Sequence, residues 1–189
     1  KTPITSMKVL ADSLLAQEDV PVELYREFME DIAKEIDREN KTITDLLSLV
    51  KMDKKVTDMN ITEVNMNDLT EVKLKRLRPI ARKRDIEVTF ESIRPVKATV
   101  DEVKISLVIS NLVENAVKYN KENGWVKVVL DADHLFFTLT VSDSGVGIPQ
   151  DAVDHIYERF YRVDKSHSRE IGGTGLGLAI TRSAVLMHR

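Results

Sequence analysis

Apolar residues in the first fifty positions recur at intervals of three and four, which is the period of a helix that buries one face. One series consists of Ile4, Met7, Ala11 and Leu14. After an interruption at 17–21, a second series consists of Phe28, Ile32, Ile36, Ile43, Leu47 and Val50. The pattern predicts two helices joined by a short loop, that is, an antiparallel helical hairpin.

A single hairpin leaves an apolar stripe without cover, and two arrangements can supply that cover. Two copies of the chain can pair into a four-helix bundle, or the hairpin can pack against the rest of its own chain. Of the two, we expect the first, a homodimer formed through residues 1–53.

The pattern changes after a polar stretch at 51–58, which predicts a linker. A short strand is expected at 61–64. Asn67 is a suitable N-cap for a helix that runs to about Lys83, with Pro79 marking an irregularity in it.

Further along the chain, helix and strand patterns alternate. They predict strands at 86–90, 125–130 and 135–141, and helices over 101–119 and 175–188. Residues 150–174 are charged and only briefly periodic, and their length predicts a mobile, functional loop. The predicted fold class is therefore α+β, with a helical hairpin over 1–53 and a mixed domain over 59–189.

The helix predicted over 101–119 has one apolar and one polar face, and Asp101 is a suitable cap for it. The polar face carries Lys104, Asn111, Asn115 and Lys118. An amide oxygen is a ligand suited to Mg²⁺, and a lysine offers its charge to phosphate. The same residues also fit an ordinary solvated helix surface.

Asp143 follows an apolar strand, and glycines stand close behind it at Gly145 and Gly147. A rigidly held carboxylate can accept a hydrogen bond from an exocyclic amine such as that of adenine. The glycines permit a tight turn that leaves room for a flat ring. An ordinary Asp-Ser-Gly turn is the other interpretation.

Four glycines lie within six residues at 172–177 and lead directly into the last predicted helix. Backbone N–H groups and the positive end of a helix dipole suit phosphate. The segment is not a P-loop, because no Gly-Lys-Ser/Thr follows. It is a poor dinucleotide fingerprint, because Leu178 occupies the last glycine position and no strand precedes it.

Composition narrows the possible partners. A net charge of -3 over 189 residues gives no overall attraction to nucleic acid or to an anionic membrane. Basic residues gather between 73 and 84 without interleaved aromatics, which favours a solvated helix face over a nucleic-acid surface. The absence of cysteine excludes disulfides and thiolate metal sites.

No apolar run reaches the roughly 20 residues of a membrane span. We expect no nucleic-acid partner and no membrane contact by these residues.

Taken in order, these segments resemble the motifs of sensor histidine kinases. Residues 111–119, Asn-Leu-Val-Glu-Asn-Ala-Val-Lys-Tyr, resemble the N box, and 143–147 resemble the G1 box. Residues 158–162, Glu-Arg-Phe-Tyr-Arg, resemble the F box, and 173–177 resemble the G2 box. Residues 1–6 resemble the segment after the phosphoacceptor histidine in the H box. The resemblance covers nearly the whole chain and implies an α/β two-layer sandwich ATPase domain of the kind shared with gyrase and mismatch-repair ATPases.

The resemblance implies a role for each matching position of the N box. Asn115 would ligate Mg²⁺, with Asn111 assisting near the phosphates. Glu114 would polarise the phosphoacceptor. Lys118 would contact phosphate, and Tyr119 would line the nucleotide pocket.

The other boxes complete the implied site. Asp143 would read adenine, with Gly145 and Gly147 shaping the floor beneath the base. Arg162 would reach the γ-phosphate when the loop orders. The G2 box would offer its backbone N–H groups to the phosphates, and it consists of Gly173, Thr174, Gly175, Leu176 and Gly177.

The chain departs from the family pattern at both ends. The phosphoacceptor would stand three residues before Lys1, and the first predicted helix contains no histidine. The strand pair that the family places after the last helix is also missing. The histidines of the chain fall in the domain 59–189 and are expected to be ordinary surface residues: His134, His155, His167 and His188. We therefore expect these residues to bind ATP but not to label themselves at the usual site.

The function implied is that of an ATP-dependent kinase, with ATP and Mg²⁺ as cofactors, that phosphorylates a histidine and relays phosphate to the receiver domain of a response regulator. Thr2, one turn after the expected acceptor, would position a water for dephosphorylation of that regulator. The implied location is cytoplasmic, at the inner face of the cell membrane for the full-length protein. Two rivals remain: another ATPase or protein-serine kinase of the same fold, and a non-catalytic dimerisation and docking module that binds no nucleotide.

Overall fold

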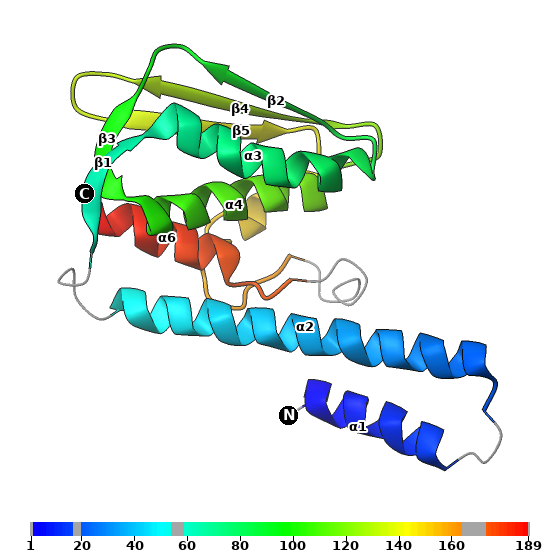
Figure 1. The fold of residues 1–189 in the computed structure, drawn as a ribbon. Helices are drawn as coiled ribbons and strands as arrows, with labels where there is room; N and C mark the ends of the chain where they lie inside the picture. Colours follow the sequence, from blue (N-terminus) through cyan, green and yellow to red (C-terminus); the bar gives the residue numbers. More distant parts are fainter. Residues whose placement is uncertain (1, 17–19, 54–58, 164–172, 189) are drawn as a thin grey trace.

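The chain begins with two antiparallel helices, α1 (Thr2–Leu15) and α2 (Val22–Asp53), which form the predicted hairpin (Figure 1). The computed structural model describes residues 2–16, 20–53, 59–163 and 173–188. Helix α2 continues through Asp53, so it includes the first residues of the stretch predicted as a linker. Within the described ranges, no helix combines the length and the apolar character needed to cross a membrane.

In the described residues, five strands form two sheets. Strand β1 (Ile61–Asn65) pairs antiparallel with β3 (Lys97–Asp101) in the smaller sheet. The larger sheet has the order β2-β4-β5. In it, β2 (Glu87–Ser92) lies parallel to β4 (Trp125–Ala132), and β4 lies antiparallel to β5 (Phe137–Asp143). The predicted hairpin between β4 and β5 is confirmed, and it leaves Asp143 at the end of a strand.

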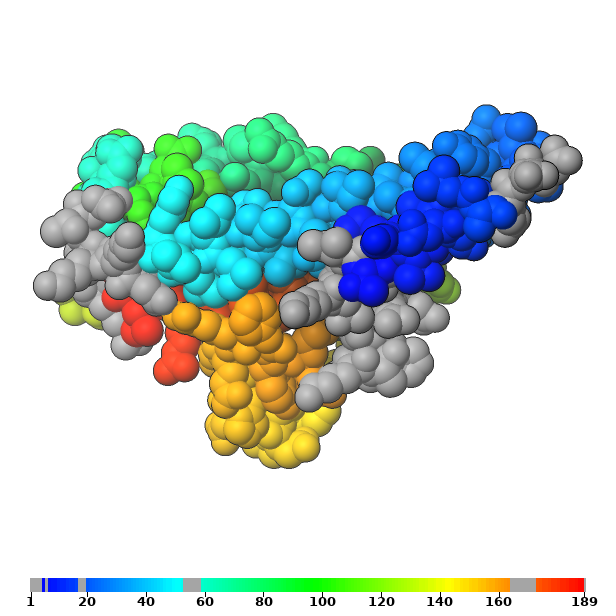
Figure 2. Space-filling model, turned by 90° about the horizontal axis from the view of Figure 1, so that it is seen from below, coloured from blue at the N-terminus to red at the C-terminus, as the bar shows by residue number. Residues whose placement is uncertain are grey.

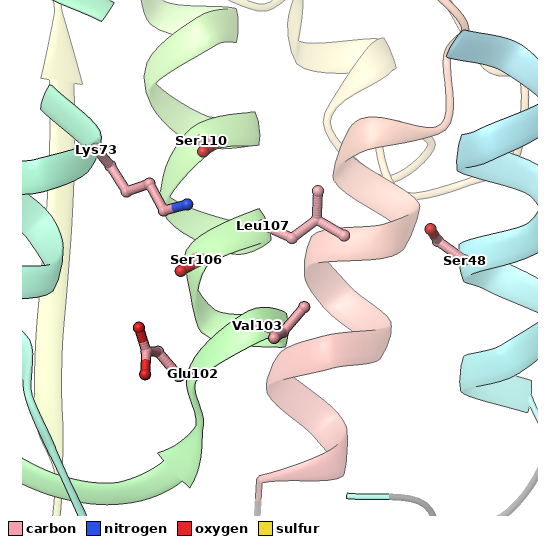
Figure 3. Close-up of a pocket in the computed structure, with 7 residues that line it drawn as sticks. All are labelled: Ser48, Lys73, Glu102, Val103, Ser106, Leu107 and Ser110. Atoms are coloured by element: carbon pink, nitrogen blue, oxygen red, sulfur yellow. The ribbon is translucent and has the colours of Figure 1, made fainter. Parts of the chain in front are cut away.

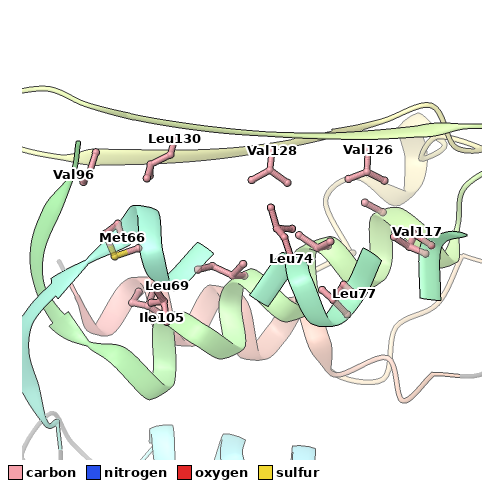
Figure 4. Close-up of a cluster of buried hydrophobic side chains, with 14 of the residues drawn as sticks. Met66, Leu69, Leu74, Leu77, Val96, Ile105, Val117, Val126, Val128 and Leu130 are labelled. Carbon is pink, nitrogen blue, oxygen red and sulfur yellow. The ribbon is translucent and has the colours of Figure 1, made fainter. Parts of the chain in front are cut away.

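Helices cover one side of the larger sheet (Figure 1). Helices α3 (Met66–Arg82) and α4 (Glu102–Lys118) pack on the sheet, and α6 (Gly177–Met187) packs against α4. The main core lies between the sheet and α3 and α4 (Figure 4). Its fully buried side chains include Leu74, Ile109, Val113, Val126 and Val128. This arrangement of a helical hairpin and a sheet layered on helices confirms the α+β class.

A smaller apolar cluster joins the hairpin to the rest of the molecule. Leu49 of α2 is 1% exposed and packs with Leu176 and Ile180, while Met52 and Leu107 lie at the margin of the cluster. The C-terminal part of α2 therefore lies along α6 (Figure 1).

The start of α3 differs from the prediction. Asn65, not Asn67, is the N-cap, and its Oδ1 accepts hydrogen bonds from the N–H groups of Asn67 (3.0 Å) and Asp68 (3.3 Å). Asn67 lies in the first turn, where its Oδ1 accepts a hydrogen bond from the N–H of Val96 (2.8 Å). Both asparagines have the chemistry of a cap, and the pairing of β1 with β3 decides which one ends the strand.

In this region strand β3 does not follow from the sequence pattern, whereas the continuation of α3 past Pro79 does. Strand β3 is not predicted, although polar and apolar residues alternate along it, because it is only five residues long and ends at the N-cap of α4. Pro79 lies within α3, and the helix continues past it to Arg82.

Candidate functional site

Helix α4 carries the predicted N box, and its start is fixed by a buried ion pair. The N–H of Lys104 donates to Oδ1 of its N-cap Asp101 at 3.0 Å, and Lys104 Nζ donates to Oδ2 at 2.6 Å. Burial opposes ionisation of this carboxyl, but the hydrogen bonds from Lys104 hold the pKa of Asp101 below its usual value. The prediction that Lys104 offers its charge to a ligand is therefore wrong, because the ammonium group is engaged in capping.

The two amides of the N box are half-buried on the polar side of α4. Asn111 Nδ2 donates to the carbonyl oxygen of Gly177 at 3.1 Å, which joins the middle of α4 to the start of α6. The side-chain amide of Asn115 makes no hydrogen bond within the part of the chain that the structure describes. Its oxygen is therefore available to a ligand.

The G1 box meets the end of α4. Asp143 Oδ1 accepts a hydrogen bond from the N–H of Gly145 at 2.8 Å, which closes a tight turn. The N–H of Val146 donates to the carbonyl oxygen of Tyr119 at 3.1 Å. A Cβ at Gly145 would lie 2.4 Å from that oxygen, so this approach requires glycine. Gly147 follows in open space, and the carboxylate of Asp143 is exposed beside it.

The F box and the G2 box meet the same end of α4. Arg162 Nη1 donates to the carbonyl oxygen of Gly173 at 2.8 Å, and the N–H of Phe160 donates to that of Gly175 at 3.0 Å. A Cβ at Gly173 would lie 2.1 Å from Lys118 Nζ, so the glycine allows the ammonium group to lie against the backbone.

These contacts bring four separate sequence segments to one end of α4. Asn115 and Lys118 are three residues apart and share one side of α4. The turn that holds Asp143 contacts the end of the same helix at Tyr119. Tyr119 is 38% exposed, and its ring centre lies 4.8 Å from Lys118 Nζ. The arrangement suits a ligand with an amino-bearing base at one end and a polyanion at the other.

Lys118 is the central cation of the site. The pKa of Lys118 is lowered to about 8, mainly by burial and then by the positive charges of Arg162, Lys41 and Arg38, while Glu114 opposes the shift. Several cations in a partly buried site repel one another, and bound phosphate would relieve that repulsion.

Helix α2 takes part in this site, which the sequence pattern does not predict. Lys41 Nζ lies 3.0 Å from Glu114 Oε2, and Thr174 Oγ1 donates to Asp45 Oδ2 at 2.8 Å. These two contacts start one turn apart on α2 and reach the N box and the G2 box. Figure 2 shows α2 lying across this side of the molecule, beside the segment around 150–163. The sequence signal is weak, because opposite charges four residues apart usually form a solvated helix pair.

Leu176 is placed differently from the other members of the G2 box. Its N–H donates to Thr174 Oγ1 at 3.2 Å, and its side chain is fully buried beside Leu49. In this arrangement its amide is engaged, so its contribution is packing.

Arg84 belongs to the basic group between 73 and 84, which the sequence predicts to be solvated. Its guanidinium donates to the carbonyl oxygens of Val117 and Lys118 at 2.8 Å each, and to that of Asn120 at 3.0 Å. A cation that binds the last carbonyls of a helix also complements the helix dipole. For Arg84 the prediction is therefore wrong: this side chain fixes the end of α4.

Comparison with known proteins identifies the arrangement. Residues 100–189 match the family described as histidine kinase-, DNA gyrase B-, and HSP90-like ATPase. The chain is 33% identical to the sensor protein kinase WalK of Staphylococcus aureus, over 100% of this chain and 46% of that protein. It is 30% identical to the solved mycobacterial sensor histidine kinase MprB, with a TM-score of 0.58 over 68% of this chain and 80% of that one. The chain belongs to the sensor histidine kinases.

The likeness in fold extends to the hairpin. The structure of histidine kinase ThkA in complex with response regulator protein TrrA aligns with 90% of this chain and 50% of that chain, at 24% identity and a TM-score of 0.71. At this identity the likeness concerns the fold alone. The chain spans less than half the length of WalK.

His188 of this histidine kinase chain is not the ordinary surface residue that the sequence predicts. The N–H of Asp101 donates to His188 Nε2 at 3.0 Å, and His188 Nδ1 lies 2.7 Å from the carbonyl oxygen of Ala184. These partners suit a neutral ring with its hydrogen on Nδ1. The ring joins the end of α6 to the N-cap of α4.

Two of the other histidines lie in described parts of the chain, and both are on the surface, as predicted. His134 is exposed, and His155 is exposed and lies 2.6 Å from Glu158, whose carboxylate raises the pKa of the ring. His167 and the side chain of Thr2 lie outside the described residues.

A hollow of about 490 Å³ lies elsewhere on the domain, where α2, α3 and α4 approach one another (Figure 3). Its lining consists of Ser48, Lys73, Glu102, Val103, Ser106, Leu107 and Ser110. None of these residues belongs to the kinase motifs, so the hollow is separate from the site at the end of α4.

The lowered pKa of Lys118 gives a prediction that needs no ligand. Its pKa is about 8 in the folded chain against 10.5 for an unperturbed lysine, so between these values the unfolded chain binds more protons. Stability then rises with pH through this window. The free energy of unfolding of the wild type, measured relative to Lys118→Met by urea denaturation, should therefore increase from pH 8 to pH 10.5. Lys75→Met, at an exposed lysine of α3, is the control. A difference in the free energy of unfolding between the wild type and Lys118→Met that does not change with pH would contradict the prediction.

Proposed function

We propose that this chain binds ATP and Mg²⁺ on the polar side of α4, and that the full-length kinase transfers the γ-phosphoryl group to a histidine of the hairpin. From there the group passes to an aspartate in the receiver domain of a response regulator. Residues 1–53 are the dimerisation and phosphotransfer hairpin, and 59–189 are the catalytic domain. The observation that carries the proposal is the meeting of the N, G1, F and G2 boxes at one end of α4.

The base end of the site lies at the G1 box. The exposed carboxylate of Asp143 accepts a hydrogen bond from the amino group of adenine. Gly145 and Gly147 leave space for the ring, and Tyr119 lines the neighbouring wall. Guanine presents a carbonyl oxygen where adenine presents an amine, so this carboxylate favours ATP over GTP.

The phosphate end lies between the N box and the G2 box. Lys118 and Arg162 supply positive charge, and backbone N–H groups of the glycines complete the cradle. Asn115 fits Mg²⁺, because its amide oxygen is available and a single protein ligand suits an ion that shares its shell with phosphates and water. An ion held there would supply positive charge to the phosphates. Asn111 acts indirectly, since its amide holds the carbonyl of Gly177.

Phosphoryl transfer asks little covalent chemistry of the protein. The bond from the γ-phosphorus to the β–γ bridging oxygen breaks as a bond to a histidine nitrogen forms, and ADP leaves. In this proposal Glu114 polarises the acceptor, and it leaves its ion pair with Lys41 to do so. Arg162 stabilises the charge that builds on the transferring group.

Exposed apolar residues of the hairpin support the proposal of a dimer. On α2, apolar residues at helical spacing are exposed in the single chain: Ile36 is 47%, Ile43 53%, Leu47 55% and Val50 52% exposed. A contiguous apolar stripe of this kind is normally covered by another surface. A second copy of the hairpin would cover it in a four-helix bundle.

The regulator partner is supported by the ThkA structure, which contains a response regulator protein. ATP and soluble regulators are found in the cytoplasm, so we place this part of the full-length kinase there, at the inner face of the membrane.

We further propose that Thr2 positions a water that removes phosphate from the regulator. Thr2→Ala in the full-length kinase should then slow regulator dephosphorylation while autophosphorylation persists. An unchanged dephosphorylation rate would refute this role.

Nucleotide binding is tested by Asn115→Ala. Loss of an amide that serves a charged group costs about 1.5–3 kcal/mol, so affinity for a fluorescent ATP analogue with Mg²⁺ should fall roughly 10- to 100-fold. Removing Mg²⁺ with a chelator should shrink the difference between variant and wild type.

Asn60→Ala is the matched control, because it makes the same chemical change at an exposed amide near the opposite end of α4. No binding by the wild type would refute the proposed function and favour a docking module without a nucleotide. Equal losses in the two variants would refute the role of Asn115.

The dimer is tested by Ile43→Glu, which places a charge in the middle of the apolar stripe. Light scattering after size-exclusion chromatography should give the mass of two chains for the wild type and of one chain for this variant. Lys34→Glu, at a side chain that is 72% exposed and off the stripe, should remain a dimer. A wild-type chain that runs as a monomer would contradict the proposal.

A further inference from the structure

We propose that Asn120 is a positioning residue for recognition of the nucleotide base. It stands directly after the N box, touches no ligand itself, and ties the end of α4 to the G1 box. The inference rests on the proposed function, because it assigns the means by which the same site selects its base.

The side chain of Asn120 is buried, at 5% exposure, and all of its hydrogen-bonding capacity is used. Its Nδ2 donates to the carbonyl oxygens of Ala116 and Trp125, at 3.0 Å each. Its Oδ1 accepts from Ser144 Oγ and from the N–H of Lys121, at 2.9 Å each. An amide has two donor hydrogens and two acceptor lone pairs, so every one has a partner. Such a group has one stable orientation.

Ser144 extends this link into the G1 box. Its Oγ donates to Asn120 and accepts from the N–H of Trp125 at 2.8 Å, while its own N–H donates to the carbonyl oxygen of Trp125 at 3.1 Å. Ser144 stands between Asp143 and Gly145 in the chain. Its position therefore sets the direction of the carboxylate proposed to read adenine.

Close packing removes other places for these groups. A Cβ at Gly124 would lie 2.2 Å from Asn120 Oδ1 and 2.6 Å from Ser144 Oγ. On the other side, Arg84 holds the carbonyl oxygen of Asn120 at 3.0 Å. Arg84 thus fixes the backbone of Asn120, and the side chain of Asn120 in turn fixes Ser144 of the G1 box through a hydrogen bond.

The consequence concerns the base end of the site more than the phosphate end. Lys118 and Asn115 lie on α4, which the core and Arg84 hold independently of the Asn120 side chain. Asp143 depends on the turn that Asn120 and Ser144 hold. A binding group must be held to within about 0.5 Å to be effective, so loosening this turn should weaken base selection and spare phosphate binding.

The experiment compares ATP, GTP and inorganic tripolyphosphate, each titrated with Mg²⁺ against the wild type, Asn120→Ala and Ser144→Ala. In both variants the ratio of the affinity for ATP to that for GTP should fall about tenfold, which corresponds to the loss of one hydrogen bond to a charged group. Their affinity for tripolyphosphate should stay within about twofold. The double variant should lose little more than either single one, because both remove the same link.

Ser144→Ala breaks the same link but leaves the buried amide of Asn120 in place, so it tests the proposal even if Asn120→Ala fails to fold. Leu74→Ala is the second control: it removes a fully buried side chain of α3 and destabilises the core, but it should leave the ATP-to-GTP preference unchanged. An ATP-to-GTP preference that is unchanged in both Asn120→Ala and Ser144→Ala would overturn the role of Asn120. So would an equal fall in affinity for tripolyphosphate. Neither result would overturn the proposed function. A wild type that binds no ATP would overturn the proposed function as well.

Discussion

The division of α4 into a buried and a polar side is the constraint on which the rest of the structure depends. Ile109 and Val113 are fully buried beneath the sheet, so the helix cannot rotate about its axis without losing its core contacts. Its two ends are also fixed, by the cap at Asp101 and by the guanidinium of Arg84. The polar side is therefore a rigid platform, and the boxes from the rest of the chain attach to it through hydrogen bonds to the backbone.

The hairpin contacts the polar side of α4 and the adjoining G2 box through α2. Leu49 anchors α2 in a buried cluster beside the G2 box, and Lys41 and Asp45 reach Glu114 and Thr174. The groups that α2 holds are thus groups that the phosphate end would use. A shift of α2 would change both the charge around Lys118 and the packing beside the glycines, so the hairpin and the candidate site are physically coupled.

Much of the fold can be predicted from the sequence, because long periodic helices and the β4–β5 hairpin leave strong local patterns. The segments that meet at the candidate site can also be predicted, since each box has a recognisable composition. What cannot be predicted is how neighbours in space share their polar groups. Asn65 rather than Asn67 caps α3, Lys104 serves the cap of α4, and Arg84 binds carbonyls far away in the chain. Each of these outcomes depends on tertiary packing that a local pattern does not contain.

The measurement that tests the account most directly is an NMR titration of the isotope-labelled chain with a non-hydrolysable ATP analogue and Mg²⁺. The backbone amides of Asn115, Gly145 and Gly175 report on the N, G1 and G2 boxes separately. The account predicts that all three resonances shift with the same midpoint at one analogue per chain. Shifts confined to one box, or midpoints that differ between boxes, would contradict it.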